Sequence, residues 1–338
     1  MRLPSATLLG IVALVSFVLM PLVVSSWVAA DFGVYFAYAI FAVSLAFLWG
    51  HAGLLSLGHA VYFGIGAYVM SIVTLGMIPG LPDLRSTWLG VVAAVVISGV
   101  AAGAVGWFFF ASRGIKGAFL GIVTLALAVV VERLAINTSW LGGMNGLMSV
   151  PPINLGLNGG GPELYDPLAA YYVMLCLLAV VIALMLLVER SPFGLALAST
   201  RENELRAASL GHNVTRLKIR AFAIGGALAG LSGALFVTQF GFVSPSLIGF
   251  ALSADVLIWV ALGGRDFLVA AALGAIGVRY LESRLSDAIG AAWPLALGAL
   301  FMLSVILFPK GVFGEAIARL DGFRARRAER SSAAGPTT

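Results

Sequence analysis

The chain has 338 residues, of which 61% are hydrophobic and 10% are Asp, Glu, Lys or Arg, and its formal net charge is +5. Ordinary soluble domains are about 45–50% apolar and about 25% charged, so this composition excludes an ordinary soluble fold. Nucleic-acid binding is not expected either, because the basic residues lie at the ends of apolar runs, where membrane topology and anionic lipid account for them.

Apolar stretches long enough to cross a membrane recur along the whole chain, since one crossing helix needs about 20 mostly apolar residues. In chain order we predict spans at 6–29, 32–49, 56–77, 87–111, 117–136, 169–188, 221–242, 247–263, 267–286 and 291–308. The glycine-rich segments near 53–66 and 247–263 have a second interpretation as broken or re-entrant helices. The predicted fold class is all-α, a polytopic helical membrane protein with about ten transmembrane helices.

The connections between these spans differ in their content of Lys and Arg. Three are basic: 112–116, the loop 189–220 and the tail from residue 310. The connection 137–168 contains no Lys or Arg. Because basic loops remain in the cytoplasm, we expect 189–220 inside, 137–168 outside and both termini cytoplasmic. The expected domains are a transmembrane domain, 1–309, and a basic cytoplasmic tail, 310–338, that is partly disordered.

The loop 189–220 holds an unusual share of the charge, in the stretch "RENELRAASLGHNVTRLKIR" at 201–220. Ser191 suits a helix N-cap, the pattern from 195 to 210 is helical with Glu202 and Arg206 spaced to pair, and Gly211 is a natural stop. One interpretation is a solvated loop that satisfies the positive-inside rule. The other is a helix at the cytoplasmic face that docks a partner protein.

Residues that carry catalysis or bind metal are not grouped in the sequence. The three histidines form no H-E-x-x-H pair, no G-x-S-x-G occurs, and no G-x-x-x-x-G-K-[ST] phosphate loop is present. Cys176 is the single cysteine, which excludes an internal disulfide and a cysteine-based metal site. We expect no cofactor, no metal and no enzymatic activity in this chain.

Ionisable residues inside the spans are functional candidates, since each costs about 2.5–3.5 kcal/mol at a helix centre. Asp255 lies mid-span, and it has two interpretations: an intramembrane ion pair with Arg279 of the next span, or a role in gating or in the substrate path. A lone acid of this kind also suits a proton-coupled carrier. Glu132 and Arg133 lie near the outer end of their span, within reach of lipid headgroups.

Small residues at spacings of three and four occur in "GLLSLGHAVYFGIGAY" (53–68) and "GGALAGLSGAL" (225–235). This pattern is typical of closely packed helices. It is also compatible with a discontinuous helix whose exposed N–H groups bind a carboxylate. The candidates for the translocation path or its gating are Ser56, His59, Tyr62, Gly64, Gly66, Asn145 and Asp255.

Six segments, in order, resemble the LivM-like permease subunits of branched-chain amino-acid ABC importers. They are "LSLGHAVYFGIGAY" (55–68), "GGMNGLMSVPP" (142–152), "SPFGLALASTRENELRAASLG" (191–211), "KIRAFAIGGALAGLSGALF" (218–236), "GG" (263–264) and "LFPKGVFG" (307–314). The resemblance runs from about residue 35 to 314, nearly the whole membrane domain. It implies the fold of an ABC importer permease in a bacterial inner membrane.

The resemblance also implies a role for the charged loop. In ABC importer permeases a cytoplasmic loop with an acid, alanines and then a glycine forms a coupling helix that docks on the ATPase subunit. Glu204, Ala207, Ala208 and Gly211 match this pattern, although Glu204 is seven residues before the glycine, one more than usual. The residues implied in coupling are Arg201, Glu202, Glu204, Arg206, Ala207, Ala208 and Gly211.

The partners implied are two ATP-binding cassette subunits, a second homologous permease, an extracytoplasmic solute-binding protein and membrane lipid. Branched-chain or other hydrophobic amino acids are the implied substrates. Permeases of urea and short-chain amide importers share much of the pattern and remain an alternative, and an ion-coupled secondary carrier is the alternative of another class. One departure is "GGRDF" (263–267), where Arg265 and Asp266 replace small or apolar residues.

Overall fold

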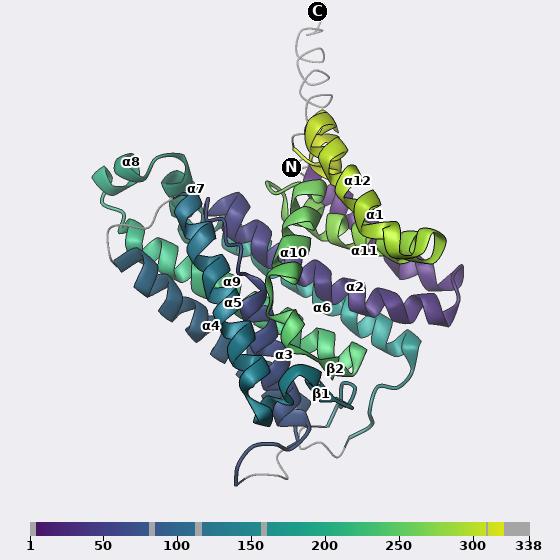
Figure 1. Ribbon diagram of the computed structural model, residues 1–338. Helices are drawn as coiled ribbons and strands as arrows, with labels where there is room; N and C mark the ends of the chain where they lie inside the picture. Colours follow the sequence, from purple (N-terminus) through teal and green to yellow (C-terminus); the bar gives the residue numbers. More distant parts are fainter. Residues whose placement is uncertain (1–4, 81–84, 112–116, 157–160, 309, 321–338) are drawn as a thin grey trace, which may run out of the picture.

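The computed structural model describes residues 5–80, 85–111, 117–156, 161–308 and 310–320, and it is predominantly helical (Figure 1). The α-helices are α1 (Ser5–Leu19), α2 (Ser26–Ala46), α3 (Ala60–Thr74), α4 (Thr87–Ala111), α5 (Ala118–Asn137), α6 (Pro167–Arg190), α7 (Pro192–Glu202), α8 (Glu204–Ser209), α9 (Val214–Phe240), α10 (Phe250–Gly263), α11 (Leu268–Ile289) and α12 (Trp293–Leu307). Short elements join them: the 3-10 helices η1 (Met20–Leu22), η3 (Ser139–Leu141), η4 (Gly143–Asn145), η5 (Pro245–Leu247) and η6 (Gly290–Ala292), the π-helix η2 (Phe47–His51), and the strands β1 (Leu147–Met148) and β2 (Phe242–Val243).

The membrane-type, all-α class predicted from composition is confirmed, but the count of ten spans is not. By length and apolar composition, the described residues contain five helices able to cross a membrane: Ser26–His51, Thr87–Ala111, Phe119–Asn137, Pro167–Arg190 and Val214–Phe240. A sixth is counted if the bent pair Phe250–Gly263 and Leu268–Ala288 is one span. Three further apolar helices are shorter, Ala6–Leu22, Ala60–Thr74 and Trp293–Leu303. The difference arises because breaks shorten several of the predicted spans.

The predicted span 56–77 is shorter than expected because its first residues are not helical. Residues 53–56 have no regular structure, and α3 begins only at Ala60. The backbone N–H of Leu57 donates to Thr124 Oγ1 at 3.0 Å, and that of Ala60 donates to Ser253 Oγ at 3.0 Å. Non-helical backbone at membrane depth is tolerated where neighbouring protein groups satisfy it, as these two hydroxyls do. The glycine-rich segment 53–66 is therefore not part of one continuous span: residues 53–59 are non-helical and residues 60–66 are helical, in agreement with its second interpretation as a broken or re-entrant helix.

The spans predicted at 247–263 and 267–286 form the pair α10 and α11, which is bent by 117° at a short break. Chain entry to α10 runs through the 3-10 turn η5, so the helix begins at Phe250 and not at 247. Gly264 follows α10 with φ of +129°, a conformation that favours glycine. The break is therefore built into the backbone at "GG" (263–264).

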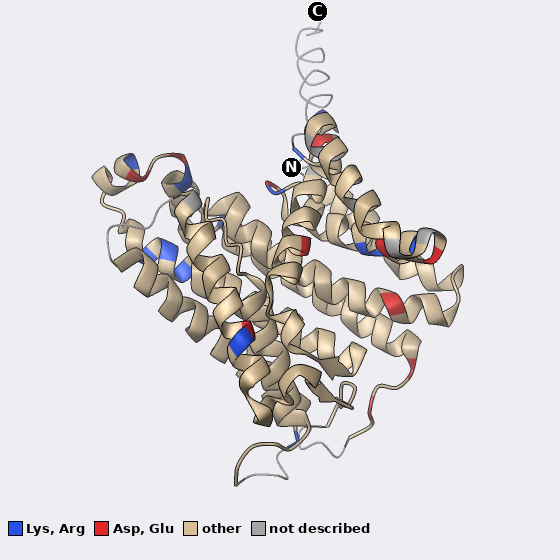
Figure 2. Cartoon of the chain, viewed as in Figure 1, with Lys and Arg blue, Asp and Glu red and all other residues tan. Residues whose placement is uncertain are grey.

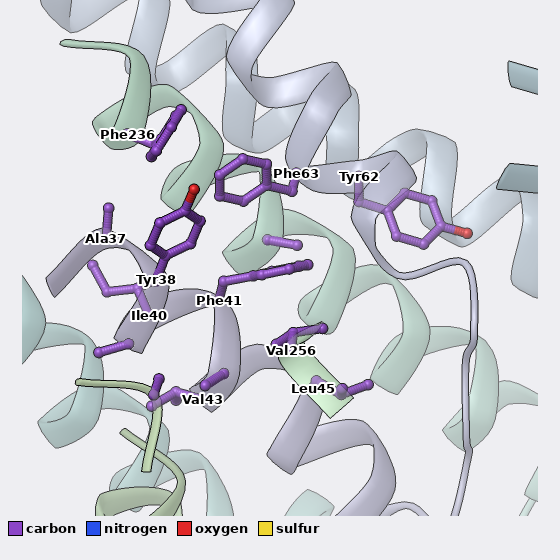
Figure 3. Packing of buried hydrophobic residues seen from close by; sticks show 14 of the residues in the cluster. Ala37, Tyr38, Ile40, Phe41, Val43, Leu45, Tyr62, Phe63, Phe236 and Val256 are labelled. Atoms are coloured by element: carbon purple, nitrogen blue, oxygen red, sulfur yellow. The ribbon is translucent and has the colours of Figure 1, made fainter. Parts of the chain in front are cut away.

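Helix α2 lies at the centre of the bundle. In the apolar window of Ser26–His51, 89% of the residues are buried, against 28% for Thr87–Ala111 on the outside. A helix that is apolar all round is one that neighbours enclose, and α6, α9, α10 and α11 all pack on α2. Its Tyr38 and Phe41 meet Phe63 of α3 and Phe236 of α9 in an aromatic cluster, with ring centroids 4.9–6.0 Å apart (Figure 3). This cluster holds the three helices together.

Two opposite ends can be distinguished in the bundle (Figure 1). At one end, β1 pairs antiparallel with β2 between the ends of α5 and α9, and the described parts of the outer connection, 138–156 and 161–166, lie nearby. At the other end lie α7 and α8, which precede the start of α9. The predicted outer connection and the predicted charged loop are thus on opposite ends.

Residues 312–320, which belong to the predicted tail, are helical, and Ile317 in this segment is fully buried. The first part of the tail therefore packs on the rest of the chain. The basic connection 112–116 and the tail from residue 321, with its "RARRAER" sequence, lie outside the described residues.

Candidate coupling site in the charged loop

The charged loop folds as two short helices, α7 and α8, and not as the single helix expected over 195–210. Ser191 caps α7, with the backbone N–H of Gly194 donating to Ser191 Oγ at 3.3 Å. Asn203 is extended, with φ of −157°, and its side chain caps α8 by accepting from the N–H of Arg206 at 3.0 Å. Asparagine competes with helical backbone in this way and so favours caps over helix interiors. The break separates Glu202 from Arg206, so their expected i, i+4 geometry is absent.

Gly211 ends α8, as the sequence predicts. Its φ of +88° is in the left-handed region. The backbone N–H of Gly211 donates to the carbonyl of Ala208, and that of His212 donates to the carbonyl of Ala207. These two bonds form the Schellman arrangement, which satisfies the last carbonyls of a helix. Gly211 therefore sets the direction in which the chain leaves the loop.

Arg201 ties the loop to two other parts of the bundle. One guanidinium nitrogen donates to the backbone carbonyl of Gly50, in the π-helix η2 that extends α2. The other lies 3.0 Å from Asp266 Oδ1, in the turn between α10 and α11. This contact accounts for the acidic residue in "GGRDF": Asp266 is a partner of Arg201. The neighbouring Arg265 lies over the ring of Trp49, 5.2 Å from its centroid.

Glu204 forms a second tie, to the first turns of α9. Its carboxylate pairs with Lys218, whose side chain is only 8% exposed. Lys218 also lies 5.7 Å from the ring centroid of Phe110 at the end of α4. A buried ammonium requires such partners, because an unpaired charge in a low-dielectric environment is strongly destabilising. Together with the buried Ala207, Arg201 and Glu204 form the face of the loop that is anchored to the bundle.

The opposite face of the loop is exposed. Leu205 and Leu210 are 80% and 71% exposed, and the side chains of Glu202, Arg206 and Ala208 are also exposed. Figure 2 shows charged residues gathered on α7, α8 and the first turns of α9, while the long helices are mostly uncharged. Large apolar side chains exposed beside charges are typical of a protein-binding surface.

The candidates for the translocation path lie in separate places. Ser56 and His59 precede α3 and Tyr62 lies in its first turn, and each is at most 1% exposed. His59 Nε2 is 2.9 Å from Ser44 Oγ, whereas His59 Nδ1, Ser56 Oγ and the Tyr62 hydroxyl have no partner in the described residues. The Tyr62 ring points away from the aromatic cluster (Figure 3) and toward Phe222, with ring centroids 5.9 Å apart.

Both glycine candidates lie at close contacts, Gly66 against α9 and Gly64 against Ile248 in the turn before α10. A Cβ on Gly66 would lie 2.1 Å from the carbonyl oxygen of Gly230 in α9, and a Cβ on Gly64 would lie 2.3 Å from Ile248 Cγ1. The structure thus supports the close-packing interpretation at these positions. Asn145 is exposed in η4, at the end of the bundle opposite the charged loop.

Asp255 is half-buried on α10, and the ion pair considered with Arg279 does not form. Arg279 Nη1 bonds instead to Glu282 Oε2 at 2.6 Å, within α11. The Arg279 guanidinium also lies 4.7 Å from the ring centroid of Tyr38 and 5.8 Å from that of Trp259. Asp255 has no hydrogen bond or ion pair with any residue that the structure describes. Its structural interpretation as an ion-pair partner is therefore wrong.

Comparison with known proteins assigns this architecture to a family. The family model described as branched-chain amino acid transport system / permease component matches residues 30–308. The chain belongs to this family. Among curated relatives, the high-affinity branched-chain amino acid transport system permease protein LivM of Escherichia coli (strain K12) is 33% identical over 296 residues, covering 81% of the chain and 67% of that protein.

Two further relatives support the assignment. LivM of Salmonella typhimurium is 32% identical over 296 residues, with the same two coverages of 81% and 67%. BraD of Pseudomonas aeruginosa, also named as a high-affinity branched-chain amino acid transport system permease protein, is 25% identical over 285 residues, covering 82% of the chain and 91% of that protein. No solved structure matches the chain. The permease is thus a transport subunit, a non-catalytic class, and the family resemblance seen in the six segments is confirmed.

Several contacts of the permease loop escaped sequence reasoning. Gly50, Lys218 and Asp266 anchor the loop, and Asn203 and Asn213 cap the helices that follow them. The two caps had a visible signal, an asparagine directly before a helical pattern. The pairing of Asp266 with Arg201 had a weaker signal in the sequence, an acidic residue in an otherwise apolar region. In the described part of the permease, no group of three or more His, Cys, Asp or Glu side chains is placed to hold a metal ion.

Proposed function

We propose that the chain is the permease subunit of an ABC importer that carries branched-chain amino acids across the bacterial inner membrane, while separate subunits hydrolyse ATP. The observation that carries the proposal is the two-faced charged loop. Arg201, Glu204 and Ala207 fasten one face to the bundle, and the other face presents Leu205, Leu210 and their charged neighbours. A surface that is rigidly attached on one side and free on the other is suited to transmit the movement of a bound partner.

The partners in this scheme are two ATPase subunits, a second homologous permease and an extracytoplasmic binding protein. The exposed face of α7 and α8 docks on an ATPase, and the opposite end, with β1, β2 and Asn145, receives the binding protein. Movement of an ATPase passes through Arg201 to α2 and to the turn between α10 and α11. Rigid-body motion of packed helices then alternates access between the two sides.

Within this scheme the path candidates take two roles. Ser56, His59 and Tyr62, around the break before α3, form a buried hinge, and Gly64 and Gly66 set the close helix contacts beside it. Asp255, half-buried without an ion pair in the described structure, lines the substrate path. The transmembrane domain comprises residues 1–309, with the loop 189–220 and both termini in the cytoplasm and 137–168 outside.

The exposed face of the loop provides the direct test. We expect Leu205→Asp to weaken ATPase binding about 30-fold or more and to lower leucine uptake accordingly, since losing a central apolar anchor of an interface costs at least about 2 kcal/mol. The variant should insert normally but no longer retain ATPase subunits on purification. Leu205 is 80% exposed, so the substitution leaves the bundle intact. Uptake in cells and mass spectrometry of the purified complex measure the two effects.

The matched control is Thr215→Asp, which adds the same charge in the exposed first turn of α9, within the loop 189–220 but outside α7 and α8. It should leave uptake and ATPase retention unchanged. Normal uptake together with normal ATPase retention in Leu205→Asp would contradict the proposal. Competition of leucine uptake by valine, urea and acetamide separates branched-chain amino acids from the alternative substrates, urea and short-chain amides.

An ion-coupled secondary carrier is the second candidate, and the observation that favours it is Asp255, which has no ion-pair partner among the residues that the structure describes. A carrier of this type requires an intramembrane acid that binds and releases a proton. It predicts uptake that a protonophore collapses while ATP is held constant, and that Asp255→Asn abolishes. The importer predicts that uptake under constant ATP survives the protonophore. Uptake into cells with clamped ATP therefore decides between the two functions.

A further inference from the structure

An apolar groove runs along the surface between α1, α6 and α11. It has a volume of about 180 Å³, and its walls come from one stripe of each helix, including Gly10, Leu14, Ala183, Leu186 and Ile276. Leu14 is 39% exposed, so the groove opens to the surroundings of the bundle and not to its interior. Among the described residues that line it, Thr7 is the one with a polar side chain. An apolar groove at this position faces lipid in a membrane protein.

The length of the groove matches one leaflet. Its lining runs along α1 from Thr7 to Phe17, ten positions apart, which is about 15 Å of helix. The hydrocarbon core of a bilayer is about 30 Å thick, so the groove extends through one half of it. One acyl chain lying along α1 fills such a space from the membrane surface toward the midplane.

A second cavity, of about 170 Å³, continues the groove at one end, and Thr7, Leu186 and Val269 line both. Its other lining residues include Glu189 and Arg190 at the end of α6 and Phe267 at the start of α11. The carboxylate of Glu189 already has a partner, because Glu189 Oε1 lies 3.0 Å from His51 Nε2. Arg190 is exposed and has no hydrogen bond or ion pair with any residue in the described part of the chain. The groove and the cavity that continues it thus end at the guanidinium of Arg190, which can bind an anionic group.

We infer that the groove and the adjoining cavity form a binding site for an anionic phospholipid, with one acyl chain between α1, α6 and α11 and the phosphate at Arg190. Charge complementarity selects this occupant over a partner helix or a neutral lipid, because basic pockets between helices at the membrane surface bind anionic headgroups. Arg190 directly precedes Ser191 and α7, so the lipid lies at the cytoplasmic leaflet if the proposed orientation holds. The groove itself does not depend on that orientation.

Lipid retention by the full-length chain, purified with the subunits that accompany it, tests the site. The protein is placed in nanodiscs of equal parts phosphatidylglycerol and phosphatidylcholine. It is then released from the nanodiscs into the gas phase, and native mass spectrometry identifies the lipids that stay bound to it. We expect the wild-type protein to retain phosphatidylglycerol over phosphatidylcholine. Arg190→Gln should lower this preference about fivefold, the effect of one basic residue near a membrane surface.

Two matched pairs of variants make the test specific. Arg220→Gln removes an exposed arginine at the same end of the bundle but outside the cavity, and it should keep the preference. Ala183→Trp fills the groove and should lower the retention of both lipids, whereas Leu184→Trp, one position along α6 and outside the groove, should not. If Ala183→Trp fails to fold, Ala13→Phe fills the groove from the α1 wall instead.

Three results would overturn the inference. These are equal retention of both lipids by the wild-type protein, an unchanged preference in Arg190→Gln, and unchanged retention in the groove-filling variants. Because the assay measures lipid and not transport, a failure here leaves the proposed transport function intact. Conversely, a failure of the transport proposal leaves this result interpretable.

Discussion

The two ion pairs of the charged loop differ in their surroundings and therefore in their effects. The side chains of Arg201 and Asp266 are 39% and 38% exposed, and an exposed pair stabilises a protein by about 0–1 kcal/mol. Lys218 is almost fully buried, so its pairing with Glu204 prevents an unpaired charge inside the bundle. The first pair therefore positions the loop, and the second also protects the fold.

We predict that the Arg201–Asp266 contact matters more for transport than for the stability of the fold. Asp266→Ala should lower the free energy of unfolding by less than about 1 kcal/mol, yet lower uptake, because the loop loses its tie to α10 and α11. Arg201→Ala should lower uptake as well and lower the free energy of unfolding more, because it also removes the bond to the Gly50 carbonyl. Asp266→Ala should have no further effect on uptake in the Arg201→Ala background, since both changes remove the same contact. Uptake and thermal unfolding of the single and double variants provide the double-mutant cycle.

Arg216→Ala is the control for that cycle, because Arg216 is an exposed arginine of the same loop region outside the contact. Its uptake should remain at the wild-type level. Additive losses of uptake in the double variant would contradict a shared role for Arg201 and Asp266.

At the scale of elements, the contact of α3 with α9 shows how small residues replace a hydrophobic driving force. A Cβ on Gly233 would lie 1.9 Å from the carbonyl oxygen of Phe63, so each of the two helices supplies a glycine to the contact: Gly66 from α3 and Gly233 from α9. Lipid is as apolar as leucine, and helices in membranes associate largely through such close packing. The aromatic cluster beside it depends on this separation of the backbones.

Gly66→Ala should therefore lower the free energy of unfolding by about 1–3 kcal/mol, the usual cost of overpacking a close contact. Gly277→Ala is the matched control, because a Cβ on Gly277 of α11 has nothing within 4 Å. That variant should be neutral or more stable by up to about 1 kcal/mol, since alanine is the better helix former. Thermal unfolding in detergent compares them, and equal stability of the two variants would show that the contact is not tight.

For the whole molecule, the opposite placement of the charged loop and of β1 and β2 predicts a sidedness that can be labelled. In a Cys176→Ala background, Asn145→Cys should react with a membrane-impermeant maleimide in intact spheroplasts. Leu210→Cys should react only after permeabilisation, because basic loops stay in the cytoplasm. Both positions are exposed, so accessibility and not burial decides the result. Labelling of Leu210→Cys in intact spheroplasts would reverse the proposed orientation.

The sequence by itself determined the class of protein, the family and the positions of three long helices, α4, α5 and α6. Long apolar runs define helices locally, and α4 has the predicted bounds, 87–111. The stop at Gly211 and the cap at Ser191 were predictable for the same reason, because each acts on backbone within a few residues.

Only the tertiary structure decided where the helices break and which charges anchor the loop. The non-helical entry to α3 exists because Thr124, 67 positions from Leu57, supplies a hydroxyl to an otherwise unsatisfied N–H. Arg201 meets Asp266 across 65 positions, and Arg279 pairs with Glu282 and not with Asp255, while its guanidinium lies over the ring of Tyr38. Such choices depend on the environment that distant segments create, and no local pattern of residues contains that information.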